Sequence, residues 1–308
     1  SFSTGKGSSG VGAVVSVVDL EGSTSATLSG GSMTQVRDVS VAALSSQRVI
    51  GAGAVAGIQT NADSTGQLMG AFVINDLSNS LTAGINSGAV VSASRNVAVR
   101  AGGTPTNNVL DDLMGTAKQS EITDFEMTST DNGYSEDIKA SMNTGERVLG
   151  VAGTLSLTAG KAASSVGLSY VQNHIQTSYS ADVNADITAL GDVDVSAYSR
   201  ANIVGVAAGA GATRGKFSGM GSASVNLIGQ RTSATVSGGT VNAASLDLDA
   251  DSSGKIFSMA GNLSFAVGSG SGTAAGGAVS YTQTGAKTYT VADTTYTVDG
   301  QTVVQKGG

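Results

Sequence analysis

The chain has 308 residues, a formal net charge of −7 at pH 7, 44 glycines, one proline, no cysteine and no tryptophan. The acidic balance argues against a nucleic-acid-binding surface, because phosphate contacts need clustered Lys and Arg. The lack of Cys excludes thiol catalysis, Cys-based zinc sites and iron–sulfur clusters. No run of about 20 apolar residues is present, so we expect no helical transmembrane segment.

The composition predicts β-structure with a thin interior rather than disorder. Val, Thr and Ile are frequent and the mean hydropathy is +0.11, whereas disordered chains are poor in β-branched residues and rich in charge and proline. Glycine costs about 0.8–1 kcal/mol per residue inside a helix relative to Ala, which disfavours helices. The first ten residues lack the basic start and apolar run of a signal peptide, so we expect the chain to begin inside a longer protein.

In chain order, the sequence is a repeat of about 55 residues. Copies begin at Val49, Val148 and Ile203, and a truncated copy begins at Ile256. A landmark position after the small-residue and Val run falls on Asp19, Asn75, Asn173, Asn226 and Tyr281, at intervals of 56, 98, 53 and 55, and the long interval holds an insertion. The organisation predicted is a partial repeat at 1–48, repeats at 49–103, 148–202 and 203–255, an insertion at 104–147, and a truncated repeat at 256–308.

Each copy contains several short strands separated by Gly and Ser turns. Residues 203–212 and 221–228 are two such strands, and a T-x-A-x-V pattern follows at residues 232–236. Val193, Val195 and Ala197 alternate with polar residues at a period of two, which is typical of a half-buried strand. A unit of this kind cannot close its own core and must stack on its neighbours. The expected fold is all-β, as an elongated β-solenoid or a stacked β-sheet array.

The insertion at 104–147 differs in composition from the repeats. It holds the only proline, Pro105, with nine acidic and three basic residues. Residues 107–119 could form a short helix whose apolar face is Val109, Leu110, Leu113 and Met114. Two interpretations remain open: a decorated loop that covers an edge, or a lateral protrusion that meets a partner.

Acidic residues on two strands raise the question of a calcium site. Asp247, Asp249 and Asp251 alternate so that their carboxylates share one face, and Asp192 and Asp194 repeat the pattern one copy earlier. Carboxylate oxygens are calcium ligands. However, neither an EF-hand loop nor the Gly-rich nonapeptide of calcium-binding coils is present, which favours a solvated acidic face.

The other candidate residues are interpreted as structural. His174 is the only histidine and has no Cys or second His with which to form a metal cluster. The glycines of residues 205–215 lack the phosphate-loop pattern and a following helix. We therefore predict no catalytic, cofactor-binding or metal-binding residue, no cofactor, and a protein that is not an enzyme.

The segments IVGVAAGAGA, SASVNLIGQRTSATV and DVDVSAYS resemble repeats of bacterial filamentous adhesins. The family includes the large leukotoxin-type adhesins and related passengers of type V and two-partner secretion. The resemblance covers nearly all of the chain except residues 104–147. It implies an exported, extracellular or cell-surface shaft of a Gram-negative bacterium that mediates attachment, aggregation or matrix formation. It also implies homotypic association or a host-surface or matrix ligand as partners.

Two alternatives stand beside this interpretation. The N-terminal partial copy and the Tyr-, Thr- and Val-rich residues 289–304 are compatible with a filament subunit whose chain ends complete each other's repeats by strand exchange. A polysaccharide-processing β-solenoid enzyme is the minor alternative. It would need a pair of carboxylates in a groove with aromatic platforms for sugar rings.

Overall fold

The computed structural model describes residues 2–4, 9–63, 65–102, 145–161, 163–267, 272–284, 294–298 and 301–305, with backbone alone for 2–4, 294–298 and 301–305. Within these ranges the regular structure consists of strands, and no helix is present. The all-β expectation is therefore confirmed. In this part of the chain there is also no helix of the length and apolarity needed to cross a membrane.

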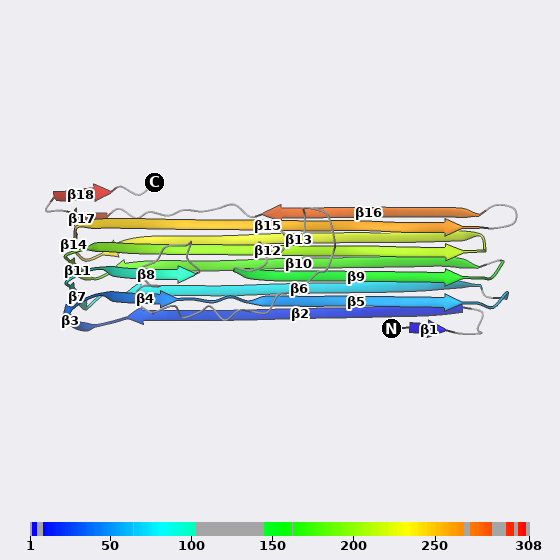
Figure 1. The fold of residues 1–308 in the computed structure, drawn as a ribbon, viewed down its shortest axis with the longest axis horizontal. Coiled ribbons are helices and arrows are strands. Elements are labelled where there is room, and N and C mark those ends of the chain that lie inside the picture. The colour runs from blue at the N-terminus through cyan, green and yellow to red at the C-terminus, as the bar shows by residue number, and fades with distance from the viewer. Residues whose placement is uncertain are drawn as a thin grey trace.

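The strands form three sheets (Figure 1). Sheet A runs in the order β1 (Phe2–Thr4), β5 (Arg48–Gln59), β9 (Glu146–Thr158), β12 (Asp192–Thr213), β8 (Val97–Gly102) and β4 (Val39–Ala43), with β15 (Ser245–Ala266) also paired to β12. Sheet B contains β16 (Thr273–Thr284), β13 (Phe217–Gly238), β10 (Ser164–Asn184), β6 (Gly66–Ile85) and β2 (Ser9–Leu28). Sheet C contains β18 (Gln301–Gln305), β17 (Thr294–Val298), β14 (Val241–Ala243), β11 (Asp186–Ala189), β7 (Ala89–Ala93) and β3 (Gly31–Val36).

The chain visits the sheets in a fixed cycle from B to C to A, and we call one such circuit a pass. The third pass, for example, is β10, β11 and β12. Successive passes pair in parallel, and the one antiparallel pairing among the described strands joins β17 to β18. The four predicted copy starts stand side by side, because Val148 pairs with both Val49 and Ile203, and Ile203 pairs with Ile256.

The predicted landmark is correct for the middle copies and wrong by one residue at both ends. Asn173 pairs with Asn75 and with Asn226, as the spacing indicated. Asn75, however, pairs with Val18 rather than Asp19, and Asn226 pairs with Thr282 rather than Tyr281. A shift of one residue reverses the face of a side chain. The three Asn side chains are buried between the sheets, whereas Asp19 and Tyr281 are exposed on the outer face.

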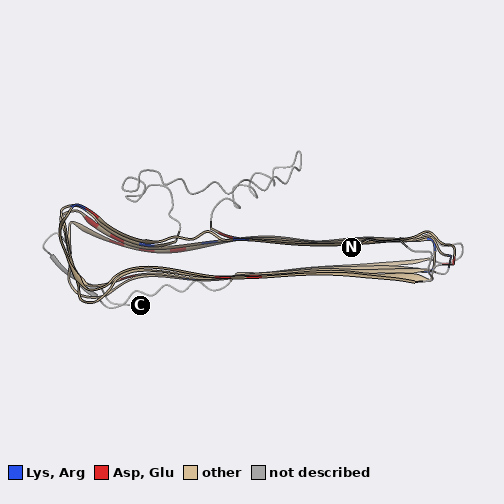
Figure 2. Cartoon of the chain, turned by 90° about the horizontal axis from the view of Figure 1, so that it is seen from below, with Lys and Arg blue, Asp and Glu red and all other residues tan. Residues whose placement is uncertain are grey.

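Seen edge-on, sheets A and B are two thin layers that separate at the end where sheet C lies (Figure 2). The largest apolar cluster fills this wide end and contains Leu81, Ile85, Tyr179, Ile187 and Val195 among its members. Elsewhere the layers approach closely. A Cβ added to Gly51, Gly150 or Gly205 would lie only 2.1–2.4 Å from the Asn side chain opposite, in sheet B. The small-residue composition is therefore what this narrow interior requires.

The predicted insertion leaves sheet A between two glycines. Residues 103–144, with the predicted helix and Pro105, lie outside the described residues. Gly102 and Gly145 both have positive φ, at 97° and 82°, and a Cβ on Gly102 would lie 2.0 Å from the carbonyl oxygen of Tyr198. In the next pass β12 continues through the same position without interruption. Glu146 and Arg147, which the sequence placed in the insertion, are the first residues of β9.

Candidate functional site

The acidic row lies on the outer face of sheet A, where Asp247, Asp249 and Asp251 are exposed. Three carboxylates of this face, those of Asp192, Asp194 and Asp249, have hydrogen-bond donors as neighbours. Arg100 forms an ion pair with Asp194, and the Tyr198 hydroxyl donates to Asp249 Oδ2 at 2.7 Å. The Ser245 hydroxyl donates to Asp192 Oδ1 at 2.6 Å. Burial, and then the hydrogen bond to Asp249, raise the pKa of the Tyr198 hydroxyl.

These contacts do not assemble a metal centre. Over the described part of the chain, no three Asp, Glu or His side chains converge in a way that could hold a metal ion. The acidic row is thus an exposed set of carboxylates on the outer face of sheet A.

His174 lies on the outer face of sheet B, beside a carboxylate. Its Nδ1 is 3.1 Å from Asp76 Oδ1, and both side chains are partly exposed. The glycine-rich residues 205–215 belong to the interior of sheet A, where Gly205 faces Asn226 and Gly211 faces Met220. Among the described residues, no hydrogen bond joins the His174–Asp76 pair to a nucleophilic side chain.

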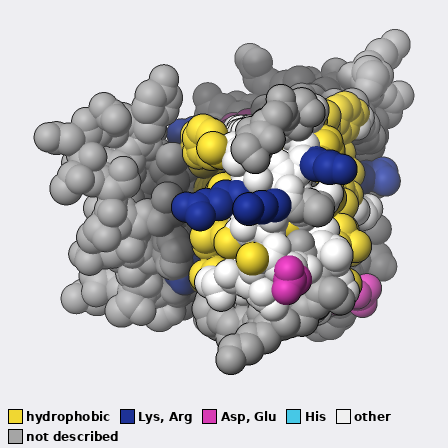
Figure 3. Space-filling model, turned by 90° about the vertical axis from the view of Figure 1, so that its right-hand side faces the viewer, with side chains coloured by type: hydrophobic (Ala, Val, Ile, Leu, Met, Phe, Trp, Pro, Cys, Tyr) yellow, Lys and Arg dark blue, Asp and Glu magenta, His cyan; other side chains and the backbone are white. Residues whose placement is uncertain are grey.

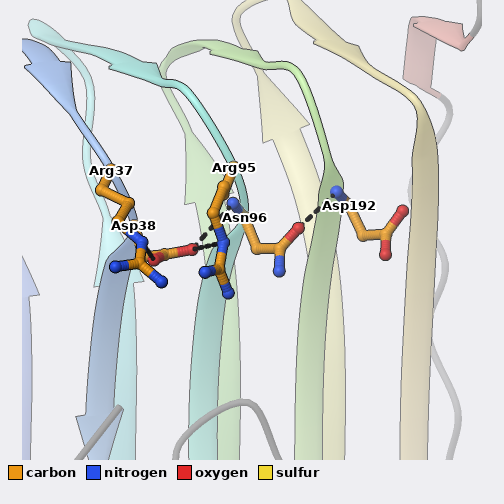
Figure 4. A network of polar contacts seen from close by, with 5 residues as sticks. All are labelled: Arg37, Asp38, Arg95, Asn96 and Asp192. Atoms are coloured by element: carbon orange, nitrogen blue, oxygen red, sulfur yellow. Dashed lines mark hydrogen bonds and ion pairs between the residues drawn. The ribbon is translucent and has the colours of Figure 1, made fainter. Parts of the chain in front are cut away.

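Asp and Asn side chains connect the passes at the corner between sheets C and A (Figure 4). Asp38 Oδ1 accepts a hydrogen bond from the backbone amide of Asn96 at 3.1 Å. Asn96 Oδ1 in turn accepts one from the amide of Asp192 at 2.9 Å. Arg37 and Arg95 both lie 3.4 Å from the Asp38 carboxylate. These contacts join three successive passes and align their corners.

A buried carboxylate stands where the insertion rejoins the sheet, and we call its surroundings the insertion root. Glu146 is fully buried and accepts hydrogen bonds from Asn79 Nδ2 at 2.6 Å and from the Tyr179 hydroxyl at 2.8 Å. The backbone amide of Gln47 donates to its other oxygen at 2.9 Å. Burial raises the pKa of the Glu146 carboxyl, and these donors oppose the increase. Burial also lowers the pKa of the adjacent Arg147.

Outer-face residues of sheet A close to the insertion root are buried as well, although they point away from sheet B. They are Ala98, Arg100, Arg147, Leu149, Ser196, Asn202 and Val204. Sequence reasoning missed this region because a Glu that ends an acidic stretch gives no sign of burial. The two glycines with positive φ, Gly102 and Gly145, were the only local signal of a sharp departure from the strand.

A shallow polar depression lies on the outer face of sheet B. Its exposed lining consists of short polar side chains and one carboxylate, from Glu21, Ser23, Ser78, Ser80, Gln176 and Ser178. It contains no aromatic side chain, and the described lining offers a hydrogen-bonding surface without a reactive group.

The long sheets end in strands with one paired side among the described strands. In sheet B, β2 pairs with β6 and β16 pairs with β13. In sheet A, β15 pairs with β12. Such edges present backbone N–H and C=O groups on which a further strand can be added.

Comparison of the chain with protein-family models, curated proteins and solved structures found no match. What the protein does is therefore inferred from its own residues and geometry.

Proposed function

We propose that this chain is a structural segment of an extracellular surface fibre of the adhesin type. In this proposal its passes are successive turns of an elongated β-solenoid shaft. The parallel pairing of one pass with the next carries the proposal. For example, β10 pairs with β6 and with β13 in an unbroken register from residue 164 to residue 183.

The free energy of such pairing is sufficient to hold a long shaft together. Each backbone hydrogen bond contributes only about 0.5–1.5 kcal/mol net, but a pass makes many of them along two long strands. Side-chain ladders add to the backbone pairing. Asn75 donates to Asn173 at 2.7 Å, and Asn173 donates to Asn226 at the same distance. Stability of this kind grows with the number of neighbouring passes, because each pass contacts only the adjacent ones.

Attachment is proposed to reside where the regular passes are interrupted. The insertion root holds both chain ends of residues 103–144 at one point on sheet A, between Gly102 and Gly145. A shaft that carries one acidic segment at a fixed place would present it laterally to a host-surface or matrix ligand. The resemblance to adhesin repeats supports the same role.

Small-angle scattering and electron microscopy of the purified chain test the shaft. We expect a thin particle whose longest dimension lies along the strands, across the direction in which the passes stack, and a β-rich circular dichroism spectrum. Display of the chain on the surface of a non-adherent Gram-negative strain should then increase attachment or aggregation of the cells. A compact, roughly spherical particle would overturn the proposal.

A filament subunit that assembles by edge pairing is the second candidate, and the open edges of sheet B favour it. β2 at one end and β16 at the other are both long strands of the same sheet. Addition of β2 of one molecule beside β16 of the next would continue the sheet. Sedimentation velocity over a wide range of concentrations separates the candidates, since a particle that stays monomeric throughout is not such a subunit.

A further inference from the structure

The half of the molecule away from sheet C, which we call the narrow half, carries its larger apolar side chains on the outer faces of sheets A and B. On the outer face of sheet B, Val11, Val15 and Val17 of β2 are 64–75% exposed. Neighbouring strands extend this surface through Leu68, Leu168, Phe217, Val279 and Tyr281. On the outer face of sheet A the exposed apolar residues are Ile50, Val151, Met259, Leu263 and Phe265, with several alanines between them. We call these surfaces apolar face B and apolar face A.

The interior of the same half is narrow and largely polar. Ser165 donates to Ser156 at 2.8 Å, and Ser156 donates to Gln67 at 2.9 Å. Thr158 donates to Thr213 at 2.8 Å. The apolar residues inside are few, and they cluster around Met69 and Val73. The Val, Leu and Phe side chains on the outer faces therefore do not contribute to this interior. Water contacts them unless something else covers them.

The two apolar faces are large for a monomer. Face B crosses five strands, about 4.8 Å apart, over about nine residues of about 3.3 Å each, which gives about 700 Å². The largest apolar patch of an ordinary monomer covers about 300–600 Å². An interface of standard size buries about 800 Å² on each partner. Face B alone therefore approaches the area of a stable protein–protein interface.

The two faces lie at the same level along the strands. Thr154 of β9 and Ser169 of β10 hydrogen bond across the interior at 3.0 Å, so their outward-pointing neighbours Leu155 and Leu168 lie back to back. The end formed by the turns between sheets A and B shows basic side chains across it and hydrophobic side chains on both flanks (Figure 3). The same hydrophobic belt thus occupies both sides of the molecule.

Opposite charges mark the inner limit of each face. On sheet B, Asp19, Asp76 and Glu21 follow the last apolar residues of β2 and β6. On sheet A, Arg48 and Lys255 lie in this position. Glu21 lies at the level of Arg48, because Gln47 of sheet A meets Gly22 of sheet B across the interior. Asp19 and Asp76 lie about two residues further along, at the level of Ile50, because Gly51 meets Asn75. Each sheet therefore ends its apolar face in charges opposite to those of the other.

We propose that apolar face B of one molecule packs on apolar face A of a second copy of this chain, with both copies in the same orientation. Matching the two faces level by level places apolar rows on apolar rows and brings Glu21 of one copy to the level of Arg48 of the next. Sheets pack about 10 Å apart in this way. The contact is heterologous and leaves a free face at each end, so it propagates into a layered stack.

Packing of face B on a second face B fits the observations less well. With strands in the same direction it would oppose Asp19 and Asp76 to their own copies, and in either direction it would leave face A uncovered. The proposed stack is also independent of the surface-fibre function and of edge pairing through β2 and β16, because it uses side chains on the sheet faces rather than backbone groups at the edges.

Disulfide trapping tests the geometry. The chain has no native Cys, so every disulfide formed must involve an introduced cysteine. We would prepare Leu155→Cys and Leu168→Cys as single variants, unfold them together, refold them as a mixture and oxidise at high protein concentration. Disulfides that join Leu155→Cys chains to Leu168→Cys chains are the expected product. Trapping of Leu168→Cys chains with one another, or no trapping in the mixture, would overturn the proposal.

A charge placed on face B gives the second arm of the test. Leu168→Glu should reduce self-association in sedimentation equilibrium by about ten-fold or more, as loss of a central apolar anchor does. Gln176→Glu adds the same charge to the same face of β10 beyond the apolar region, and should leave association within about two-fold of the parent.

Two readouts make the outcome unambiguous. Unchanged circular dichroism of both variants shows that the fold is kept, and the trapping of cysteines decides the matter if Leu168→Glu fails to fold. Flotation with neutral phosphatidylcholine vesicles should leave the protein at the bottom of the gradient. Vesicle binding without self-association would show that the apolar faces bind lipid, and would overturn the proposal that a second copy covers them.

Discussion

The three buried asparagines at positions 75, 173 and 226 show how single residues align the passes. Each side chain donates to the next at 2.7 Å, and the ladder ends on the Ser258 hydroxyl, which accepts from Asn226 at 2.7 Å. Gly51, Gly150 and Gly205 leave the space that the Asn side chains occupy. A polar ladder in a narrow interior specifies the register, because a shift of one residue would bury unpaired amides.

Replacement of a central asparagine should therefore destabilise the protein. In Asn173→Ala, the amide of Asn75 loses its close acceptor and Asn226 Oδ1 loses its donor. With about 1–3 kcal/mol for each unsatisfied buried group, we expect a loss of about 2–5 kcal/mol in the free energy of unfolding. Chemical denaturation measures it. Gln176→Ala, on the exposed outer face of the same strand, is the control and should change stability by less than about 0.5 kcal/mol.

The carboxyl of Glu146 should make stability depend on pH. Its pKa is raised in the folded state by burial, so the folded protein holds this proton more tightly than the unfolded chain does. The stability contribution of Glu146 is therefore greatest below its unfolded pKa and declines as pH rises through the folded pKa.

Comparison with Glu146→Gln isolates this effect from other titrating groups. The difference in unfolding free energy between the parent and the variant should become less favourable to the parent as pH is raised from about 4 to 8. Denaturation at a series of pH values measures it. A difference that stays constant, or that grows in favour of the parent, would contradict the assigned burial effect.

Among the elements, β9 and β12 show that the insertion is an addition to the sheet rather than a part of it. β12 pairs with β8 through residues 193–198 and with β9 through residues 201–213. Two residues of β12 therefore bridge the gap that residues 103–145 span in the pass before. The strand needs none of the inserted segment to complete its pairing.

Removal of residues 103–144 should thus leave the sheets intact. We would join Gly102 to Gly145 through one serine, the residue at the equivalent position 199 of β12. The circular dichroism spectrum should keep its β signature, and attachment conferred by the displayed chain should fall to the background level. Attachment that persists in a folded deletion variant would move the adhesive role from the insertion to the shaft.

For the whole molecule, neighbouring passes should contribute unequally to stability. Every residue of β16 is exposed, whereas Leu20, Ala26 and Leu28 of β2 pack on the apolar clusters. Removal of residues 272–308 should therefore lower the thermal midpoint by only a few °C, and removal of residues 1–47 should lower it by about 10 °C or more. Differential scanning calorimetry of the two truncations measures the contrast. Equal effects would contradict the inference that the buried contacts of β2 stabilise the protein more than β16 does.

The sequence alone predicted the β-class, because it depends on local features. Alternation at a period of two and turn residues are visible in any single strand. Val49, Val148, Ile203 and Ile256 pair side by side as their spacing indicated. The residues of the candidate site were not predicted, since Glu146 is brought to Asn79 and Tyr179 by pairing between distant segments.

What only the tertiary structure decided is which face of each strand points inward. Alternation separates two faces but does not say which of them meets the other sheet. In the narrow half the Ser, Thr, Asn and Gln side chains face inward, because they can satisfy one another's hydrogen bonds across the gap. Apolar side chains inside this half are few and cluster around Met69 and Val73, and its Leu and Phe side chains lie outside.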